Sequence, residues 1–512
     1  MTELAFESAL SLVEKIRHKE ISAVELLEFY LQRVEQYNPA LNAIIFTQIE
    51  KARKQAEGAD AALARGENWG PLHGVPMTIK DSFDWVGSPS TWGNPKLKDN
   101  YPERDTESVE RLQNAGAVIF GKTNIPLMLA DWQSFNEIYG TTNNPWDMTR
   151  VPGGSSGGSA AALASGLTGL EIGSDIGASI RNPAHYCGVF GHKPTYGIVP
   201  GHPLPGVYAE TDIAVCGPLA RSAADLAAAL DVLAGVAGAD AAGWKLDLPK
   251  ARKHVLKDYK VGVLLSSPCC AQDDELTDQL QNAVDRLAQA GVQVDDTARP
   301  SFDLERSHHV YLMLLRAATG TGLADAEFGK HLEGKSNLTD EDLSYRSYIY
   351  RGVTLCHRDW WQLHNEREKL RLAWAEFFQE YDLLLCPIAA SAAYPHDHEG
   401  ERADRTILVN GKPEPTTDQL FWAGLSCNVY LPSSVAPVGL TRSQLPCGLQ
   451  IVGPYLHDHT CIEFARLIEQ EFGASRSVVI LSGPSFSTEV ARQLPTAVSV
   501  AGHDAKTVAM VQ

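Results

Sequence analysis

Short apolar runs alternate with amphipathic segments along most of this 512-residue chain, and this alternation constrains the fold more than any other feature. Runs at 75–79, 117–120 and 261–265 have the length and composition of strands. Helical periodicity occupies 106–115, with a second helical face at 276–287. Strands that alternate with helices are typical of a sheet covered by helices on both faces, so we predict the α/β class.

The first 65 residues have helical periodicity instead. Ser22-Ala-Val-Glu25 is a capping box, and the helix that it opens should stop at Asn38-Pro39. A second helix is expected from Phe46 to Arg65, because Gly66 can cap its C-terminus. Residues 1–65 are therefore predicted to form an N-terminal helical segment of the main domain.

The globular pattern ends before the chain does. A capping box at Thr460-Cys-Ile-Glu463 predicts a helix through Phe472 that Gly473 terminates. The core of the domain should therefore extend over 66–473, and residues 474–512 are predicted to form an appended tail.

The charge balance argues against nucleic-acid binding. The chain has 44 Lys and Arg against 63 Asp and Glu, a net charge of −19, whereas a nucleic-acid-binding surface needs an excess of basic residues. Its nine cysteines are odd in number and lack a C-x-x-C motif, which fits reduced thiols better than a disulfide framework. Neither a signal-peptide pattern nor an apolar run of about 18 residues is present. We expect a cytoplasmic protein that binds neither nucleic acid nor membranes.

The stretch from Gly153 to Gly177 is rich in Gly, Ser and Ala. Such small side chains let the backbone approach a substrate or other backbone closely. A flexible linker has a similar composition, but helical and strand patterns at 160–164 and 170–172 favour an ordered segment. Ser155 and Ser156 each satisfy G-x-S-x-G, yet turn-forming residues precede them where a nucleophile elbow needs a strand.

Seven motifs distributed along the chain are Gly74-Val-Pro-Met-Thr-Ile-Lys-Asp81, Gly121-Lys-Thr-Asn124, Asn144-Pro-Trp146, Gly153-Gly-Ser-Ser-Gly-Gly-Ser-Ala-Ala-Ala162, Gly173-Ser-Asp-Ile-Gly-Ala-Ser-Ile-Arg-Asn-Pro183, Gly191-His-Lys-Pro-Thr195 and Gly448-Leu-Gln-Ile-Val-Gly453. Together they resemble the amidase signature family over roughly residues 5 to 473. The resemblance implies that family's α/β fold, with a large mixed central sheet flanked by helices on both faces. It also implies a substrate-pocket insert at about 300–425 and no cofactor.

The resemblance further implies a Ser–cis-Ser–Lys triad. Lys80 matches the family's lysine, Ser155 its bridging serine with a preceding cis peptide bond, and Ser179 its nucleophile. A serine hydroxyl attacks only when a base removes its proton, and lysine is a base only when it is neutral. Burial can lower a lysine pKa from about 10.4 by roughly 3–5, which is enough to give a neutral amine near pH 7. The apolar flank Met77-Thr-Ile79 predicts that Lys80 is buried.

Acyl transfer also needs donors for the developing oxyanion. The resemblance assigns this oxyanion hole to the backbone N–H groups of Ile176, Gly177, Ala178 and Ser179. Alanine stands at 178 where the family often has glycine, and it supplies the same N–H if its backbone conformation is tolerated.

Three further residues should support this loop: Ser156, Asp175 and Arg181. For Asp175 and Arg181 the alternative is an ordinary surface ion pair. The apolar candidates for the substrate pocket are Met128, Leu129, Trp132 and Tyr139.

Two other kinds of site fit the sequence less well. The pairs His396-Asp-His398 and His457-Asp-His459 have metal-ligand spacing but lack a third ligand, so no metal is expected. A Ser-His-Asp triad through His185 or His192 is not excluded by spacing, but the match at Lys80 makes it unnecessary.

These observations predict an amidohydrolase that cleaves linear amide C–N bonds through a serine acyl-enzyme, with a small-molecule amide as its substrate. The Tyr, Trp and Leu content from His308 to Trp422 favours apolar or aryl amides, and the same chemistry would cleave esters or carbamates. The alternative is the glutaminase subunit of a tRNA-dependent amidotransferase, which would need partner subunits. A catalytically inactive homologue is disfavoured because all three triad positions are filled, and the resemblance also allows a homodimer.

The tail carries a second, shorter resemblance. Residues 479–498 are similar to an internal stretch of NAD-dependent glycerol-3-phosphate dehydrogenases. The Gly-rich turn and the sheet of a nucleotide site are missing, so no dehydrogenase activity is expected.

Overall fold

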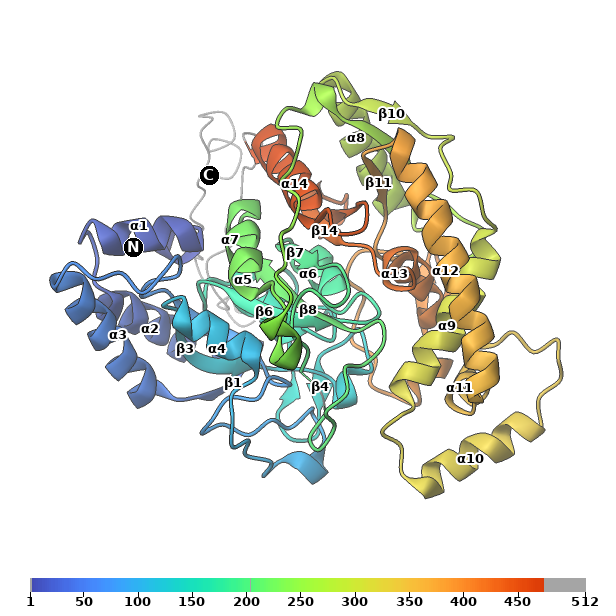
Figure 1. The fold of residues 1–512 in the computed structure, drawn as a ribbon, viewed down its shortest axis with the longest axis horizontal. Helices are drawn as coiled ribbons and strands as arrows, with labels where there is room; N and C mark the ends of the chain where they lie inside the picture. Colours follow the sequence, from blue (N-terminus) through green and yellow to red (C-terminus); the bar gives the residue numbers. More distant parts are fainter. Residues whose placement is uncertain (1, 203, 474–512) are drawn as a thin grey trace, which may run out of the picture.

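The computed structural model describes residues 2–202 and 204–473, and within them eleven strands form one mixed sheet (Figure 1). Across the sheet the strands lie in the order β1 (Ile44–Thr47), β3 (Val118–Thr123), β2 (Pro76–Lys80), β6 (Glu171–Asp175), β8 (Val215–Ala220), β7 (Phe190–Lys193), β14 (Ser433–Leu440), β15 (Pro446–Val452), β11 (Leu383–Cys386), β9 (Lys260–Val263) and β10 (Gln293–Asp295). β2 pairs in parallel with both β3 and β6, whereas β8 pairs antiparallel with β6 and β7. The predicted α/β class and the mixed central sheet are confirmed.

Two buried apolar clusters lie on the two faces of this sheet. In β11, Leu383 and Leu385 belong to the first cluster and Leu384 to the second, because successive side chains of a strand point to opposite faces. The first cluster includes residues of α1 (Ala9–Arg17), α2 (Ala23–Leu41), α3 (Ile49–Ala64), α4 (Glu107–Asn114), α7 (Ala223–Leu233), α8 (Asp274–Gln289) and α14 (Asp458–Gly473). The second includes residues of α6 (Arg181–Cys187), α9 (Leu304–Thr319), α11 (Tyr345–Val353), α12 (His357–Glu380) and α13 (Leu420–Cys427). α5 (Gly157–Ala164) contributes to both clusters.

Helix α8 illustrates how the sequence specifies these elements. Its buried residues are Leu276, Leu280, Ala283, Val284 and Leu287, which is the face predicted from the sequence. The Asp273 side chain accepts a hydrogen bond from the Glu275 N–H and so caps the helix at its N-terminus. The amphipathic pattern and the cap together fix both the existence of this helix and its orientation on the sheet.

The N-terminal segment differs from the prediction in two ways. α2 begins with the expected capping box of Ser22 and Glu25, but it continues past Pro39 to Leu41. Proline in a last turn removes only one backbone donor, and the helix tolerates this loss. The helix expected from Phe46 begins instead at Ile49, because the preceding residues form β1 and pair antiparallel with β3. The segment 1–65 is therefore not purely helical.

The region 300–425, predicted to form a substrate-pocket insert, contains a strand of the central sheet as well as helices and a hairpin. It contains β11, which lies inside the central sheet between β15 and β9. Around β11 the region supplies α9, α10 (Asp325–Ser336), α11, α12, the hairpin β12 (Thr406–Val409) with β13 (Lys412–Pro415), and α13. Helices α9 to α12 gather on one side of the molecule, opposite α1 to α3 (Figure 1).

The helices of the described ranges can also be compared with what a membrane span requires. Within the described ranges, no helix combines the length and apolar character needed to cross a membrane. The predicted tail at 474–512 lies outside the described residues.

Candidate active site

The site is assembled at one edge of the central sheet. Lys80 is the last residue of β2, and Ser179 follows β6, the neighbouring parallel strand. The carboxyl ends of parallel strands meet at the same edge, which brings these segments together. Ser155 lies in the loop before α5, and the peptide bond between Gly154 and Ser155 is cis. Within this arrangement the Lys80 Nζ lies 2.7 Å from the Ser155 Oγ.

Lys80 has no exposed surface, as its apolar flank predicted. Besides Ser155, its Nζ contacts the Ser174 Oγ at 2.9 Å. Burial disfavours the ammonium form and lowers the pKa of Lys80 to about 7, although the negative charge of Asp175 opposes the shift. At neutral pH a large share of Lys80 is therefore an uncharged amine that can accept a proton across the same 2.7 Å contact.

A backbone hydrogen bond connects Ser179 to the loop that contains Ser155 and Ser156. The Ser156 N–H, next in the chain to Ser155, donates to the Ser179 carbonyl at 3.1 Å. The Ser179 side chain is almost buried, with 5% of the residue exposed, and among the described residues its hydroxyl has no hydrogen-bond partner. Catalytic hydrogen bonds often form only when substrate binds, so this free hydroxyl is compatible with a nucleophile.

The glycines in the loop that contains Ser155 and at the start of α5 are required by close packing. A Cβ on Gly154 would overlap the Asp131 carbonyl oxygen and lie 2.9 Å from the Trp132 Cα. A Cβ on Gly158 would overlap the backbone of Asn124 in the same way. The run of small residues therefore allows this loop to press against two other backbone segments, and it is not a flexible linker.

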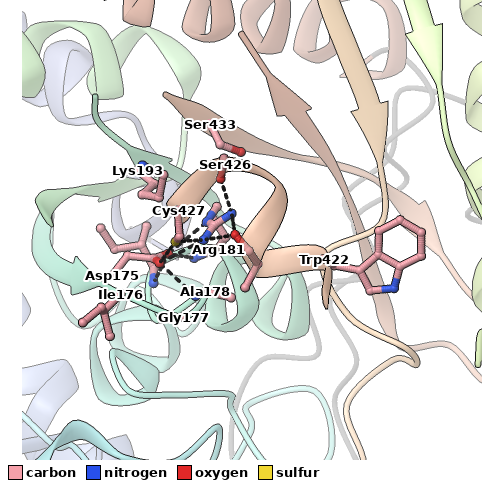
Figure 2. Close-up of polar contacts among 12 residues, drawn as sticks. Asp175, Ile176, Gly177, Ala178, Arg181, Lys193, Trp422, Ser426, Cys427 and Ser433 are labelled. Carbon is pink, nitrogen blue, oxygen red and sulfur yellow. Dashed lines mark hydrogen bonds and ion pairs between the residues drawn. The ribbon is translucent and has the colours of Figure 1, made fainter. Parts of the chain in front are cut away.

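A buried ion pair anchors the segment that bears Ser179 (Figure 2). The Arg181 Nη2 and Nε lie 3.0 Å from the two carboxylate oxygens of Asp175, and neither side chain is exposed. Arg181 Nη1 also donates to the Ser426 Oγ at 2.8 Å and to the Gln450 Oε1 at 2.5 Å. Burial alone would raise the pKa of Asp175, but the Arg181 guanidinium lowers it to about 2. This geometry is not that of a surface ion pair.

Asp175 also engages the predicted oxyanion loop directly. Its Oδ1 accepts the Ala178 N–H at 2.8 Å, and its Oδ2 accepts the Ile180 N–H at 3.0 Å. The Ala178 N–H is thus already paired and does not point into a free oxyanion site. Ala178 has a φ of 73°, in the left-handed region, which costs a non-glycine residue about 1–2 kcal/mol.

Three of the four N–H groups predicted for the oxyanion hole are not paired. In the part of the chain that the structure describes, the N–H groups of Ile176, Gly177 and Ser179 have no acceptor. Most buried backbone N–H groups in proteins are paired, so three free ones within the segment 176–179 are unusual. Free donors of this kind are what a developing oxyanion requires.

The four pocket candidates occupy different environments. Trp132 is buried and its indole Nε1 donates to the Gly177 carbonyl at 2.7 Å, so it contacts the segment that leads to Ser179. Met128 is exposed, with its Sδ 3.6 Å from the Asn94 amide, and it adjoins Leu129 in a short 3₁₀ turn. Tyr139 is half-buried in the loop between β4 (Phe135–Asn136) and β5 (Gly140–Thr141).

Several residues of the site were not predicted. Ser174 and Gln450 lie inside motifs that carried the family resemblance, so the sequence held a signal for them. Tyr311 and Leu420 lie in the region from His308 to Trp422, whose composition indicated apolar side chains but singled out neither residue. A Cβ on Gly177 would lie 3.2 Å from the Leu420 Cδ2 and 3.4 Å from the Tyr311 Oη. These two side chains therefore form a wall beside residues 176–179, the predicted oxyanion loop.

His192 forms a Ser-His-Asp arrangement that serves a structural role. Its Nδ1 lies 2.8 Å from the Ser434 Oγ and its Nε2 3.0 Å from the Asp458 Oδ1, with all three residues fully buried. Asp458 also accepts hydrogen bonds from Thr195, so the network ties α14 to the sheet. His185 is buried as well, and its Nδ1 accepts the N–H of Gly448 at 2.7 Å.

Neither histidine pair has a third potential metal ligand placed with it in the described ranges. Within residues 2–202 and 204–473, no group of three His, Cys, Asp or Glu side chains is placed to bind a metal ion. A cavity of about 450 Å³ lies between α7 and α14, and its lining includes His459 and Arg466 but neither Lys80 nor Ser179.

Known proteins are similar to this chain in sequence and in fold. The chain is 30% identical over 498 residues to the A subunit of glutamyl-tRNA(Gln) amidotransferase from Acidothermus cellulolyticus, covering 92% of this chain and 95% of that protein. It is 31% identical over 488 residues to the corresponding protein from Moorella thermoacetica, covering 91% and 97%. Among solved structures it resembles a bacterial aryl acylamidase, with a TM-score of 0.78, 25% identity, and 91% and 96% of the chains covered. It also resembles 6-aminohexanoate cyclic dimer hydrolase, with a TM-score of 0.73, 27% identity, and 91% and 97% covered.

Two family models match the sequence. The model for the N-terminus of NAD-dependent glycerol-3-phosphate dehydrogenase matches residues 456–508, most of which lie outside the described ranges. The amidase model matches residues 25–462, which is most of the chain and contains every residue of the site described above. The protein is therefore a hydrolase of the amidase signature family.

Proposed function

We propose that this chain acts alone as an amidohydrolase of apolar or aryl amides, through an acyl-enzyme on Ser179. The observation that carries the proposal is the buried contact of 2.7 Å between the Lys80 Nζ and the Ser155 Oγ. Burial at this position lowers the pKa of Lys80 to about 7. Because this pKa lies near neutrality, the same amine can take a proton from Ser155 and later return it.

The reaction follows from this arrangement. Neutral Lys80 accepts the Ser155 hydroxyl proton while Ser155 accepts the proton of Ser179, and the Ser179 Oγ attacks the amide carbon. The oxyanion forms beside the free N–H groups of the Ile176–Ser179 segment. As the C–N bond breaks, the proton returns through Ser155 to the leaving amine. Water then attacks the acyl-enzyme while Lys80 takes its proton through Ser155. The proton returns to the Ser179 Oγ as the acyl–oxygen bond breaks and the acid leaves.

The wall beside the oxyanion loop supports an apolar substrate. Leu420 and Tyr311 approach Gly177, and Trp132 lies behind its carbonyl. α13, which carries Leu420, is fully buried and contributes Phe421 and Trp422 to the same apolar cluster. Glutamine would bring a charged ammonium and a carboxylate next to these groups, and both are costly to bury unpaired. The related amidotransferase proteins nevertheless make a glutaminase the second candidate.

A substrate panel distinguishes the two candidates. The chain alone should hydrolyse an aryl anilide and an aliphatic amide, and it should leave glutamine unchanged, because the wall offers apolar contacts. A fluorophosphonate probe should label one residue, Ser179, identified by mass spectrometry of the digested protein. Turnover of glutamine only after partner subunits are added, with no anilide hydrolysis, would favour the amidotransferase instead.

The pH dependence tests the role of Lys80. Since only neutral Lys80 can accept a proton, kcat/KM for an anilide should rise with pH through a single step near 7 and then level off. Below the step the rate should fall about tenfold per pH unit, while the fold stays intact by circular dichroism. Lys80→Arg should be nearly inactive at every pH, because arginine stays protonated. A step near 10 would mean that the lysine is not desolvated during catalysis.

We also propose a reducing, cytoplasmic setting for this activity. All nine cysteines lie within the described residues, and none of them is in a disulfide.

A further inference from the structure

Two side chains from distant parts of the chain hold consecutive carbonyls of the loop after β6. The Tyr311 hydroxyl, from α9, donates to the Ile176 carbonyl at 2.9 Å across a separation of 135 residues. The Trp132 indole donates to the next carbonyl, that of Gly177, at 2.7 Å. In a planar trans peptide unit the C=O and the following N–H point in opposite directions. A donor that fixes one of these carbonyls therefore also fixes the direction of an N–H.

The two peptide units differ at their N–H ends. In the Gly177–Ala178 unit, Trp132 holds the carbonyl and Asp175 accepts the Ala178 N–H at 2.8 Å, so both ends are paired. In the Ile176–Gly177 unit, Tyr311 holds the carbonyl, while the buried Gly177 N–H has no acceptor among the described residues. Hydrogen bonds thus fix the Gly177–Ala178 unit at both its C=O and its N–H. They fix the Ile176–Gly177 unit only at its C=O, and the Gly177 N–H stays free.

We propose that Tyr311 is a positioning residue for the reaction: its hydroxyl holds the Ile176 carbonyl so that the Gly177 N–H is aimed at the oxyanion. This inference rests on the proposed function, with Ser179 as the nucleophile. Without the hydroxyl the Ile176–Gly177 unit could rotate, and part of the preorganised donation to the transition state would be lost.

The packing around Tyr311 suits this role. A Cβ on Gly424 would lie 2.5 Å from the Tyr311 Cδ1, so the ring rests on a helix position of α13 that has no side chain. Tyr311 has no exposed surface, and burial raises its pKa well above the usual range. The phenol therefore remains an O–H donor at any pH at which the enzyme works, and its position is fixed by the contact between α9 and α13.

The test is Tyr311→Phe, which removes the hydroxyl and keeps the ring. We expect kcat on an anilide to fall by about 10–100-fold, less than the loss of an oxyanion donor itself, with KM unchanged within about twofold. The affinity for a trifluoromethyl ketone analogue, which forms an oxyanion on Ser179, should fall by the same factor as kcat/KM. The pH step near 7 should stay in place because Lys80 is untouched, a result that general damage to the site would not give.

The matched control is Tyr348→Phe. Tyr348 is also largely buried, and its hydroxyl contacts His309 of α9 at 3.2 Å, but it does not touch the oxyanion loop. Its kcat and its affinity for the ketone should equal those of the parent enzyme. If Tyr311→Phe does not fold, 2,3-difluorotyrosine incorporated at 311 keeps the ring and the hydroxyl but changes its donor strength. That change should alter kcat, and the same replacement at 348 should not.

The outcomes separate this inference from the function on which it rests. If Ser179→Ala is inactive while Tyr311→Phe is folded and keeps parental kcat and ketone affinity, Tyr311 does not position the loop and the proposed function stands. If Ser179→Ala retains parental activity, the proposed function is wrong, whatever Tyr311→Phe does.

Discussion

Replacing Ser179 by alanine should lower kcat on any amide substrate by about 10⁴–10⁶-fold, because the acyl-enzyme can no longer form. The side chain is nearly buried and makes no hydrogen bond with the described residues, so the fold should not change. The measurement is kcat with a sensitive anilide, together with the loss of fluorophosphonate labelling and an unchanged circular dichroism spectrum.

Ser165→Ala is the matched control for this variant. Ser165 lies at the C-terminal end of α5, where its hydroxyl donates to the Ala161 carbonyl, and it has no contact with Lys80 or Ser155. Its kcat should equal that of the parent enzyme. More than about 1% of parental turnover by pure Ser179→Ala would contradict the assignment of the nucleophile.

Arg181→Met should lower the free energy of unfolding by about 3–5 kcal/mol, because it leaves the carboxylate of Asp175 buried without its partner. The loss includes hydrogen bonds to Ser426 and Gln450, whose acceptors are also buried. Activity should fall as well, since Asp175 holds the Ala178 N–H next to Ser179, the proposed nucleophile. Urea unfolding followed by circular dichroism gives the change in stability.

The control for this prediction is an exposed ion pair. Arg65 contacts Glu67 at 2.7 Å with more than half of each side chain exposed, so Arg65→Met should cost less than about 1 kcal/mol. The double variant Asp175→Asn with Arg181→Met should recover part of the loss, because the uncompensated charge is removed. A loss below about 1 kcal/mol for Arg181→Met alone would mean that water reaches the pair.

Elements of the fold that depend on local pattern could be predicted from the sequence. The run at 75–79 is β2, and the apolar face of 276–287 is that of α8. β1 could not be recognised, because Ile44–Thr47 becomes a strand only by pairing with β3. β11 was missed for the same reason: four apolar residues at 383–386 follow a long helix and find their partners in β9 and β15.

The residues of the site also differ in whether the sequence could predict them. Lys80 and Ser155 could be named because the motifs that contain them are contiguous in sequence, and the structure places them in contact. The pairing of Ala178 with Asp175 could not be foreseen, because it depends on the turn between β6 and α6. Tyr311 could not be foreseen either, because it reaches Ile176 only when α9 packs on α13.

The pairing of β7 with β14 has a consequence for how the chain is made. Lys80, Ser155 and Ser179 have all left the ribosome long before β14 is synthesised, since His192 and Ser434, which meet across that pairing, are 242 residues apart. At about 5–20 residues per second, the nascent chain waits roughly 10–50 seconds for that partner strand. During this interval the edge of β7 is open to other chains. A message cut short after the catalytic motifs would therefore yield an aggregation-prone fragment that depends on chaperones, and no smaller working enzyme.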